Sequence, residues 1–372
     1  INFSLTARRI PRADPSLTTT KLPFHAGTMA RRSRSRSSPP MSRPDHTHIP
    51  AAVMDITSAH DPVARRRRLV RRLALLASLL MLTVVAVSAY MRLSQSGLGC
   101  DGWPACYGTG SGHEPSSLMS RASPGLAWAR VTHRVVASTM LLLVLCLVAM
   151  TARHRPHLRR EARLALAVLL LTLWLAGLGA AMRGATSPAV VLGNLLGGLA
   201  TLALCWRLVV VAGAGTAPPA PAPALRRWAW AGLLLVLLQA ALGGLVDARH
   251  AATTCRYAAE CADIVRGTGW DWRVLSPWAS SSLEGPLAAD VRGAWLHLLH
   301  RAGALLLLPV LSVVAWKALR QDFSAQAIAL GLLLVLELTL GSLLAATGFP
   351  LLAVLAHNLV AALLLALLAG LA

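Results

Sequence analysis

Histidines inside apolar segments are the residues of this sequence best suited to chemistry. His133, His297, His300 and His357 lie in or beside long apolar runs. A buried imidazole in a lipid environment is costly without a partner, and neutral imidazoles on facing helices can hold haem iron in a bundle. His300 and His357 form the preferred pair. His297 lies one turn before His300 on nearly the same helix face and is the alternative ligand. A single histidine of this kind can also serve only as a helix–helix hydrogen bond.

Two pairs of cysteines share one spacing, with five residues between the partners: Cys100 and Cys106, and Cys255 and Cys261. Zinc is one interpretation, and it would recruit further ligands such as His113 and His250. A disulfide within each loop is the interpretation we favour, which requires that the loops lie in an oxidising compartment. Cys146 and Cys205 fall inside apolar runs, where we expect them to be packing residues.

The composition is that of a membrane protein. Of the 372 residues, 55% are hydrophobic and only 14% are charged, whereas soluble domains carry roughly a quarter of charged residues. Apolar runs long enough to cross a hydrocarbon core of ~30 Å recur along the chain, and the alternating pattern of a membrane barrel is absent. We therefore predict an all-α membrane protein with eight transmembrane helices, at residues 69–92, 131–152, 164–182, 190–212, 228–246, 293–316, 325–346 and 351–371.

The net charge of +21 would fit a nucleic-acid-binding protein, but its distribution does not. The arginines concentrate before the first apolar run and in the loops after the second, fourth and sixth runs. This is the positive-inside pattern of a protein embedded in the lipid bilayer. It predicts that both termini are cytoplasmic, that the long loops after the first and fifth spans are outside, and that no nucleic acid is bound.

The order of features divides the chain. Residues 1–64 are rich in Arg, Ser and Pro and are predicted to be a disordered basic extension. A transit peptide is one explanation, and a start assigned too far upstream, with Met54 or Met41 as the initiator, is the one we favour. Residues 65–212 and 228–372 are predicted to be two pseudo-symmetric four-helix bundles joined by a Pro/Ala linker, 213–227. Each half has a cysteine pair, then a His-Arg dipeptide, then a proline before its last span.

Charged residues near the spans are further candidates. Arg134 and Arg301 each follow a histidine and could pair with haem propionates, although arginines at span ends also snorkel to the interface. Glu337 lies within the seventh span, where an acid is a functional candidate by default. We expect it to have a structural or proton-relay role. Asp247 and Arg249, at the outer end of the fifth span, are expected to be interfacial.

Taken in order, these segments resemble the haem A synthase family of cytochrome oxidase assembly proteins, and its proteobacterial form in particular. The resemblance covers roughly residues 70–372, and GLGCDGWPACYG is its most specific piece. The segments that carry it are YMRLSQSGLGCDGWPACYG, AWARVTHR and NLLGGLATLAL in the first half, and LGGLVDARHAATTCRYAAEC, LHLLHRAGAL and LAVLAHNLVAALLL in the second. It implies a multi-pass protein of the bacterial inner membrane.

The resemblance also implies roles for individual residues. A haem b would lie in the second bundle, with His300 and His357 as axial ligands and Arg301 nearby. The first bundle would bind the substrate haem O, with His133 on its iron, and oxidise a methyl group to the formyl group of haem A. Cys100–Cys106 and Cys255–Cys261 would be disulfides, the first near the active site. Haem O synthase, oxidase assembly factors and a second copy of the chain are the partners it suggests.

Two positions depart from the family pattern. Where the family has a glutamate three residues before the first histidine, this chain has Arg130, and Asn194 replaces the second histidine. A carboxylate could act as a base or stabilise positive charge, which arginine cannot, and asparagine is a poor iron ligand beside imidazole.

One hypothesis for the function is a working enzyme with a five-coordinate substrate iron, to which His113 and Glu114 could supply acid or base. The other is a haem-b-binding paralogue that carries electrons or haem. A transporter is disfavoured because each half has an even number of spans, so that the repeats are parallel, and because no Gly/Pro-broken stretch in the middle of a span is obvious.

Overall fold

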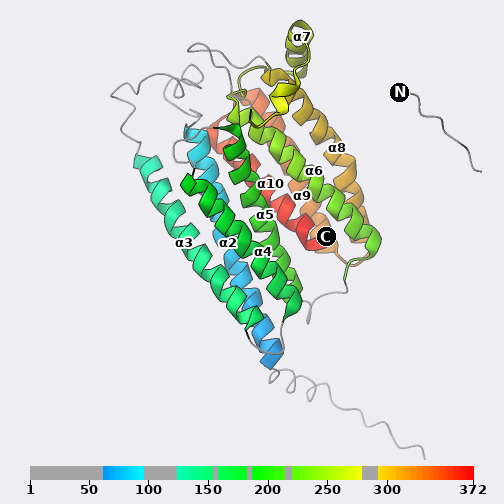
Figure 1. Cartoon of the computed structure of the whole chain (residues 1–372). Coiled ribbons are helices and arrows are strands. Elements are labelled where there is room, and N and C mark those ends of the chain that lie inside the picture. Colours follow the sequence, from blue (N-terminus) through cyan, green and yellow to red (C-terminus); the bar gives the residue numbers. More distant parts are fainter. Residues whose placement is uncertain (1–61, 96–123, 154–157, 182–186, 214–219, 279–291) are drawn as a thin grey trace, which may run out of the picture. The chain divides into compact units, whose positions relative to one another are not determined.

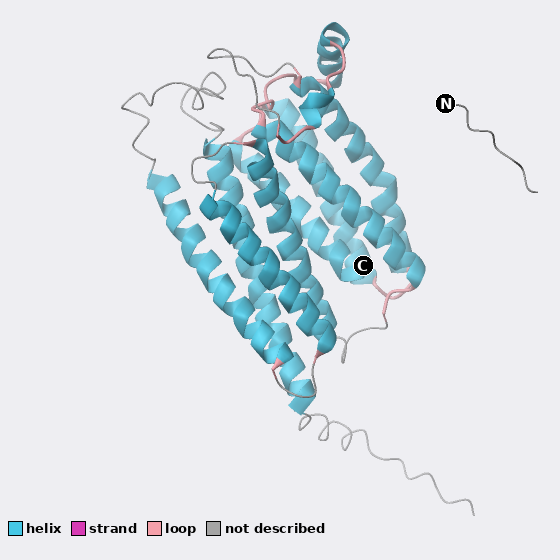
Figure 2. Cartoon of the chain, viewed as in Figure 1, coloured by secondary structure: helices cyan, strands magenta, loops and turns pink. Residues whose placement is uncertain are grey.

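The computed structural model describes residues 62–95, 124–153, 158–181, 187–213, 220–278 and 292–372. Within these ranges the secondary structure is helical and no strand is present (Figure 2). Eight of the described helices are long and apolar enough to cross a membrane, which confirms the predicted all-α membrane class. They are α2 (Pro62–Gln95), α3 (Pro124–Ala152), α4 (Arg159–Ala181), α5 (Pro188–Ala212), α6 (Pro223–Ala248), α8 (Gly293–Leu319), α9 (Ser324–Thr347) and α10 (Leu351–Leu371).

Several helices begin before the predicted spans. α2 begins at Pro62, α3 at Pro124 and α6 at Pro223, each ahead of its apolar run. Proline suits the first helical turn because its missing N–H would have no partner there. Hydropathy marks the part of a helix that lipid covers, whereas the hydrogen-bonded helix continues past it. α2 therefore includes the end of the segment predicted as a disordered extension, 1–64, and α6 includes the end of the predicted linker, 213–227.

The spanning helices form two rings of neighbours (Figure 1). In the first, α2 packs against α3, α3 against α4, α4 against α5, and α5 against α2. In the second, α6, α8, α9 and α10 follow one another in the same way. The rings meet where α5 contacts α10 and α6, and where α2 contacts α10. α5 and α10 are thus central to the contact between the two sets.

Small residues let α5 approach its neighbours closely. In its most apolar stretch, 56% of α5 is buried, compared with 11% for α4. A Cβ at Gly197 would lie 2.8 Å from the ring of Trp174 and 2.7 Å from Leu175 on α4. On the other side, a Cβ at Gly244 of α6 would lie 2.7 Å from Leu195 of α5. Without a hydrophobic driving force between helices in lipid, such close backbone packing is a main source of helix association.

The connection between α6 and α8 contains structure that the sequence analysis did not predict. It includes α7 (Ala258–Thr268) and the 3-10 helix η2 (Trp272–Leu275). Asp271 precedes η2, accepts a hydrogen bond from the Arg273 N–H at 2.9 Å, and lies 3.3 Å from Arg292 Nη1. The hydrogen bond from Arg273 and the charge of Arg292 together hold the pKa of Asp271 below its ordinary value. Hydropathy did not predict α7 because this short amphipathic helix is not an apolar span.

Asp247 and Arg249 are more buried than their expected interfacial placement implies. The Arg249 residue is 3% exposed, and its Nη2 donates to the carbonyl oxygens of Arg273 and Ser276, each at 2.9 Å. Oδ2 of Asp247 lies 2.7 Å from Nε of Arg92 on α2. Both residues therefore tie α6 to other segments, Arg249 to the η2 loop and Asp247 to the first ring of helices.

Candidate functional site

His300 on α8 and His357 on α10 lie opposite one another. Their ring centroids are 6.4 Å apart, and the ring planes cross at 72°. A metal–imidazole bond is about 2 Å long, and the ring centroid lies about 1 Å behind the bonding nitrogen, so two rings on opposite sides of one metal have centroids about 6 Å apart. The observed separation therefore suits one metal ion held between the two imidazoles.

The backbone and ring of His300 are supported from α6. Gln239 Nε2 donates to the His300 carbonyl oxygen at 2.6 Å. One turn later, Gly243 leaves room for the imidazole, because a Cβ there would lie only 3.2 Å from His300 Cε1. On α8 itself, a Cβ at Gly303 would collide with Gln239 Oε1. Two glycines therefore allow α6 and α8 to approach closely at the histidine.

The ring of His357 is supported from α9 in a corresponding way. Glu337 Oε1 lies 3.3 Å from His357 Nδ1, with the side chains 17% and 22% exposed, respectively. One turn along α9, a Cβ at Gly341 would lie 3.4 Å from His357 Cε1. A polar side chain followed four residues later by glycine thus stands beside each histidine, Gln239 and Gly243 for one and Glu337 and Gly341 for the other.

Gln239, Gly243 and Gly341 were not predicted from the sequence. The available signal was a polar residue inside an apolar span with glycine one helical turn away, which occurs in both α6 and α9. Glu337 was identified as a buried acid, but not as a neighbour of His357. The helices that contact α8 and α10 could not be deduced from the periodicity of either span.

His297, the alternative ligand, is occupied elsewhere. It is 6% exposed, and its Nε2 lies 2.8 Å from the carbonyl oxygen of Ala251, to which an N–H at this position donates. The ring therefore joins the start of α8 to the loop that follows α6. This leaves His300 as the α8 histidine that faces α10, in agreement with the preferred pairing.

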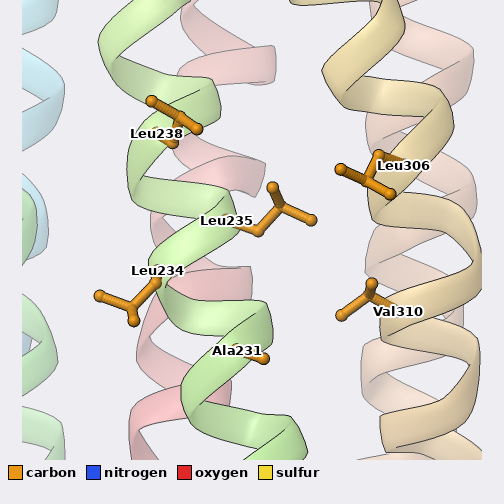
Figure 3. Close-up of a pocket in the computed structure, with 6 residues that line it drawn as sticks. All are labelled: Ala231, Leu234, Leu235, Leu238, Leu306 and Val310. Atoms are coloured by element: carbon orange, nitrogen blue, oxygen red, sulfur yellow. The ribbon is translucent and has the colours of Figure 1, made fainter. Parts of the chain in front are cut away.

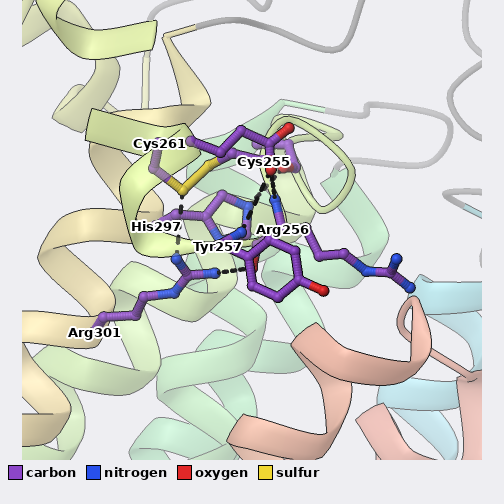
Figure 4. Close-up of a disulfide and its surroundings, with 8 residues drawn as sticks. Cys255, Arg256, Tyr257, Cys261, His297 and Arg301 are labelled. Carbon is purple, nitrogen blue, oxygen red and sulfur yellow. Dashed lines mark hydrogen bonds between the residues drawn. A yellow bond between two sulfur atoms is a disulfide. The ribbon is translucent and has the colours of Figure 1, made fainter. Parts of the chain in front are cut away.

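Arg301 contacts the disulfide loop. Cys255 and Cys261 are joined in a disulfide, as predicted for this pair (Figure 4). Arg301 Nη2 donates to the carbonyl oxygen of Arg256 at 2.8 Å, and Nη1 lies 3.5 Å from Cys261 Sγ. Because both sulfurs are in the disulfide, neither is available as a thiolate ligand for zinc. The expected pairing of Arg301 with a propionate stays a prediction.

The candidate residues of the first ring lie on two of its helices. His133 on α3 is half-buried, and Arg130, one turn earlier, is exposed. Asn194 on α5 is half-buried. No hydrogen bond joins His133 to Asn194 in the part of the chain that the structure describes. Cys100, Cys106, His113 and Glu114 lie outside the described residues, so the predictions made for them stay open.

The cysteines within the spans differ from one another. Cys205 is 1% exposed and lies in the main apolar core, which confirms its predicted packing role. Cys146 is exposed on α3, so the same prediction is wrong for this residue. The apolar sequence around Cys146 placed it in a span but did not show which face of α3 it occupies.

An open pocket of ≈ 370 Å³ lies between α6 and α8, and no histidine lines it (Figure 3). It is lined by aliphatic residues alone: Ala231, Leu234, Leu235, Leu238, Leu306 and Val310. Such a lining offers nothing to a polar or charged group. In a membrane-spanning region it suits hydrocarbon, and it contributes no residue to the candidate site.

The histidine pair is better suited to iron held in a porphyrin than to a bare metal ion. Among the described residues, no group of three or more His, Cys, Asp and Glu side chains is arranged to hold a metal ion. A bare ion usually needs four or more protein ligands or waters. Iron in a porphyrin already has its equatorial ligands and needs only axial ones, which two facing imidazoles supply. The site is therefore suited to a bis-histidine haem.

Comparisons with known proteins show the family to which the chain belongs. The model of the cytochrome oxidase assembly protein family matches residues 71–369. The chain is also 30% identical over 309 residues to the protein named heme A synthase from Shewanella oneidensis strain MR-1, a match that covers 76% of this chain and 90% of that protein. The family match includes both histidines of the facing pair and all eight spanning helices in whole or in large part. This chain belongs to the cytochrome oxidase assembly protein family.

Proposed function

We propose that this chain is a haem A synthase, an oxidoreductase that converts a methyl group of haem O to the formyl group of haem A for cytochrome oxidase assembly. Its family and its heme A synthase relative support the reaction. The observation in this chain that carries the proposal is the facing pair of His300 and His357, with ring centroids 6.4 Å apart. Haem O synthase and oxidase assembly factors are the partners this role requires.

The resident cofactor of the second ring is haem b in this proposal. His300 and His357 would bind its iron, while Gln239 donates to the His300 backbone and Glu337 lies beside the His357 ring. A bound haem b supplies one-electron redox chemistry, which suits an oxidation whose electrons must leave the substrate site. Arg301, already fixed by the disulfide loop, brings positive charge near a propionate.

The substrate site lies in the first ring. His133 is the ligand to the substrate iron, and α3 and α5 carry the remaining family positions, Arg130 and Asn194. The exposed guanidinium of Arg130 is suited to bind a carboxylate such as a propionate, and not to remove a proton. The acid–base groups of the reaction then come from the loop after α2, where His113 and Glu114 lie.

The proposed topology has two pseudo-symmetric bundles in the bacterial inner membrane. The matching order of neighbours in the two rings supports the duplication. The basic loops support cytoplasmic termini. The disulfide beside α7 supports an outer location for that end of the helices, since disulfides persist in oxidising compartments.

A second candidate function rests on Arg130 and Asn194. If those two residues disable the substrate site, the chain is a haem-b-binding paralogue that carries electrons or haem. It would keep the chemistry of the second ring and lack that of the first. The two candidates differ in what they do with haem O, so a single experiment separates them.

Haem extraction tests the proposal. The full chain is produced together with a haem O synthase in a bacterial host without its own haem A synthase, and the extracted haems are separated by chromatography. We expect haem A from the unmodified chain and from Asn358→Ala, a control whose amide bonds, among the described residues, to Val354 of its own helix. We expect no haem A from His133→Ala, and loss of the bis-histidine spectrum from His300→Ala and His357→Ala.

Unconverted haem O beside well-folded, haem-b-loaded protein would overturn the enzyme proposal and favour the paralogue. The double substitution Arg130→Glu with Asn194→His restores the family groups. If this variant makes haem A where the unmodified chain does not, those two positions account for the inactive site.

A further inference from the structure

Glu337 carries a carboxylate into the middle of a membrane-spanning helix, where charge is costly. Its Oε1 lies 3.3 Å from His357 Nδ1, and among the described residues neither that nitrogen nor Glu337 Oε2 makes a hydrogen bond to any other group. We propose that Glu337 is a positioning residue for haem b, which fixes the orientation of His357 and increases electron donation from its imidazole to the iron. This inference rests on the proposed haem b site.

The geometry determines which nitrogen of His357 is left for the metal. Glu337 and Gly341 are one turn apart on α9 and meet the same edge of the imidazole. A Cβ at Gly341 would lie 3.4 Å from Cε1 and 4.0 Å from Nδ1. Since α9 covers the Nδ1–Cε1 edge, an N–H at Nδ1 directed to Glu337 leaves Nε2 unprotonated and free to bind iron. A carboxylate that fixes the tautomer of a metal-bound histidine is a common outer-shell arrangement.

The partner histidine is supported differently. Neither His300 Nδ1 nor His357 Nδ1 makes a hydrogen bond within the described residues, but among those residues only His357 has a carboxylate oxygen 3.3 Å from that nitrogen. Gln239, the polar residue on the corresponding helix, donates to the His300 backbone carbonyl and not to its ring. The two axial ligands are therefore unequal, because a carboxylate stands beside His357 alone. A more basic imidazole stabilises ferric over ferrous iron, which lowers the reduction potential.

A structural role for Glu337 would have different consequences. If the carboxylate only joined α9 to α10, replacing it would lower stability and leave the ligand-field spectrum of the bound haem unchanged, although the loss of its charge would still shift the potential. A role through the imidazole must appear in the reduction potential and in the ligand-field spectrum. Both can be measured without any haem A being formed.

The first experiment uses the full chain loaded with haem b and purified in detergent. Its reduction potential and the low-temperature electron paramagnetic resonance of the ferric haem are compared among variants. Glu337→Gln keeps an oxygen acceptor and removes the charge, so we expect a higher potential with haem retained. Glu337→Ala removes both, and we expect a higher potential with haem affinity lowered by about 10–100-fold. Thr339→Val is the matched control, because its hydroxyl bonds only to Val335 of α9.

The second experiment isolates the hydrogen bond. In His357→Gly, added imidazole can bind the iron and donate its free N–H to Glu337, whereas 1-methylimidazole can bind the iron but cannot donate. We expect imidazole to bind more tightly, by about tenfold, as for other outer-shell partners. Combining His357→Gly with Glu337→Ala should remove that preference. The two imidazoles are compared in the same His357→Gly protein, so every residue around the iron is the same in both measurements. This comparison does not depend on the stability of Glu337→Ala.

The outcomes separate this inference from the proposed function. An unchanged ligand-field spectrum in both Glu337 variants, or equal binding of the two imidazoles, would overturn the positioning role while the haem site stands. If His357→Ala kept a normal bis-histidine haem, the proposed site itself would be wrong. A changed ligand-field spectrum in Glu337→Gln without any haem A formation would support the inference and count only against the enzyme proposal.

Discussion

A glycine lies beside each imidazole of the facing pair, and the two glycines leave different amounts of room for a side chain. A Cβ at Gly341 would make ordinary contact with His357 Cε1 at 3.4 Å, whereas one at Gly243 would lie at 3.2 Å from His300 Cε1, closer than is comfortable. Because His300 is also held through its backbone by Gln239, its ring has little freedom to move away. The two glycines are therefore unequal in what they tolerate.

This inequality gives a prediction about haem content. We expect Gly341→Ala to retain haem b, Gly243→Ala to lose about half of it, and leucine at either position to abolish binding, since interiors tolerate little added volume. Gly331→Ala is the control on α9, because a Cβ there meets nothing within 4 Å. Haem per protein is measured by pyridine haemochrome. Full haem loading of the leucine variants would show that the imidazoles do not need this space.

At the scale of elements, the α6–α8 connection is fixed to the helix that carries His300. Arg301 bonds to the Arg256 carbonyl next to the disulfide, and His297 bonds to Ala251 at the start of the connection. Arg256 in turn donates to the carbonyl oxygens of Ala345 and Ala346 at the end of α9. The disulfide loop thus bridges α8, which carries His300, and the end of α9.

We predict that replacing Cys255 and Cys261 by serine lowers the free energy of unfolding by about 2 kcal/mol, the chain-entropy value for so short a ring, and makes this loop more mobile. Hydrogen exchange of the loop residues should become faster, and haem b should dissociate sooner from the holoprotein. Cys146→Ser, on the exposed face of α3, is the control. Unaltered exchange in the double variant would mean that Arg301 and His297 hold the loop without the disulfide.

At the scale of the whole molecule, a charge pair links the two rings of helices. Arg92 Nε on α2 and Asp247 Oδ2 on α6 are 2.7 Å apart, with side chains 17% and 11% exposed. Removing one member of a buried pair leaves the other charge without compensation, which is more damaging than losing both. At the other end of the helices, Arg207 of α5 donates to the Gly370 carbonyl of α10 at 3.1 Å. Gly370 is near the C-terminus of α10, where the helix dipole stabilises a cation.

For the pair Arg92 and Asp247 we predict that Asp247→Asn lowers the free energy of unfolding by about 3 kcal/mol. Arg92→Leu should have a similar effect, and the two together should cost less than their sum. Unfolding of the detergent-solubilised protein in a double-mutant cycle measures the coupling. Additive effects would show that other contacts of these residues, and not the pair, join the rings.

The sequence by itself determined the membrane class, the number of spans and the order of motifs, because these depend on hydropathy and local spacing. It also predicted the pair His300 and His357, whose rings face one another, while their binding of iron stays a prediction. It could not determine the partners of each helix. Gln239, Gly243 and Gly341 became part of the site only because α6 packs against α8 and α9 against α10. Glu337 acquired a role, and Cys146 lost its predicted one, for the same reason. Nearly uniform apolar spans do not record which face meets a neighbour, so tertiary packing alone decides it.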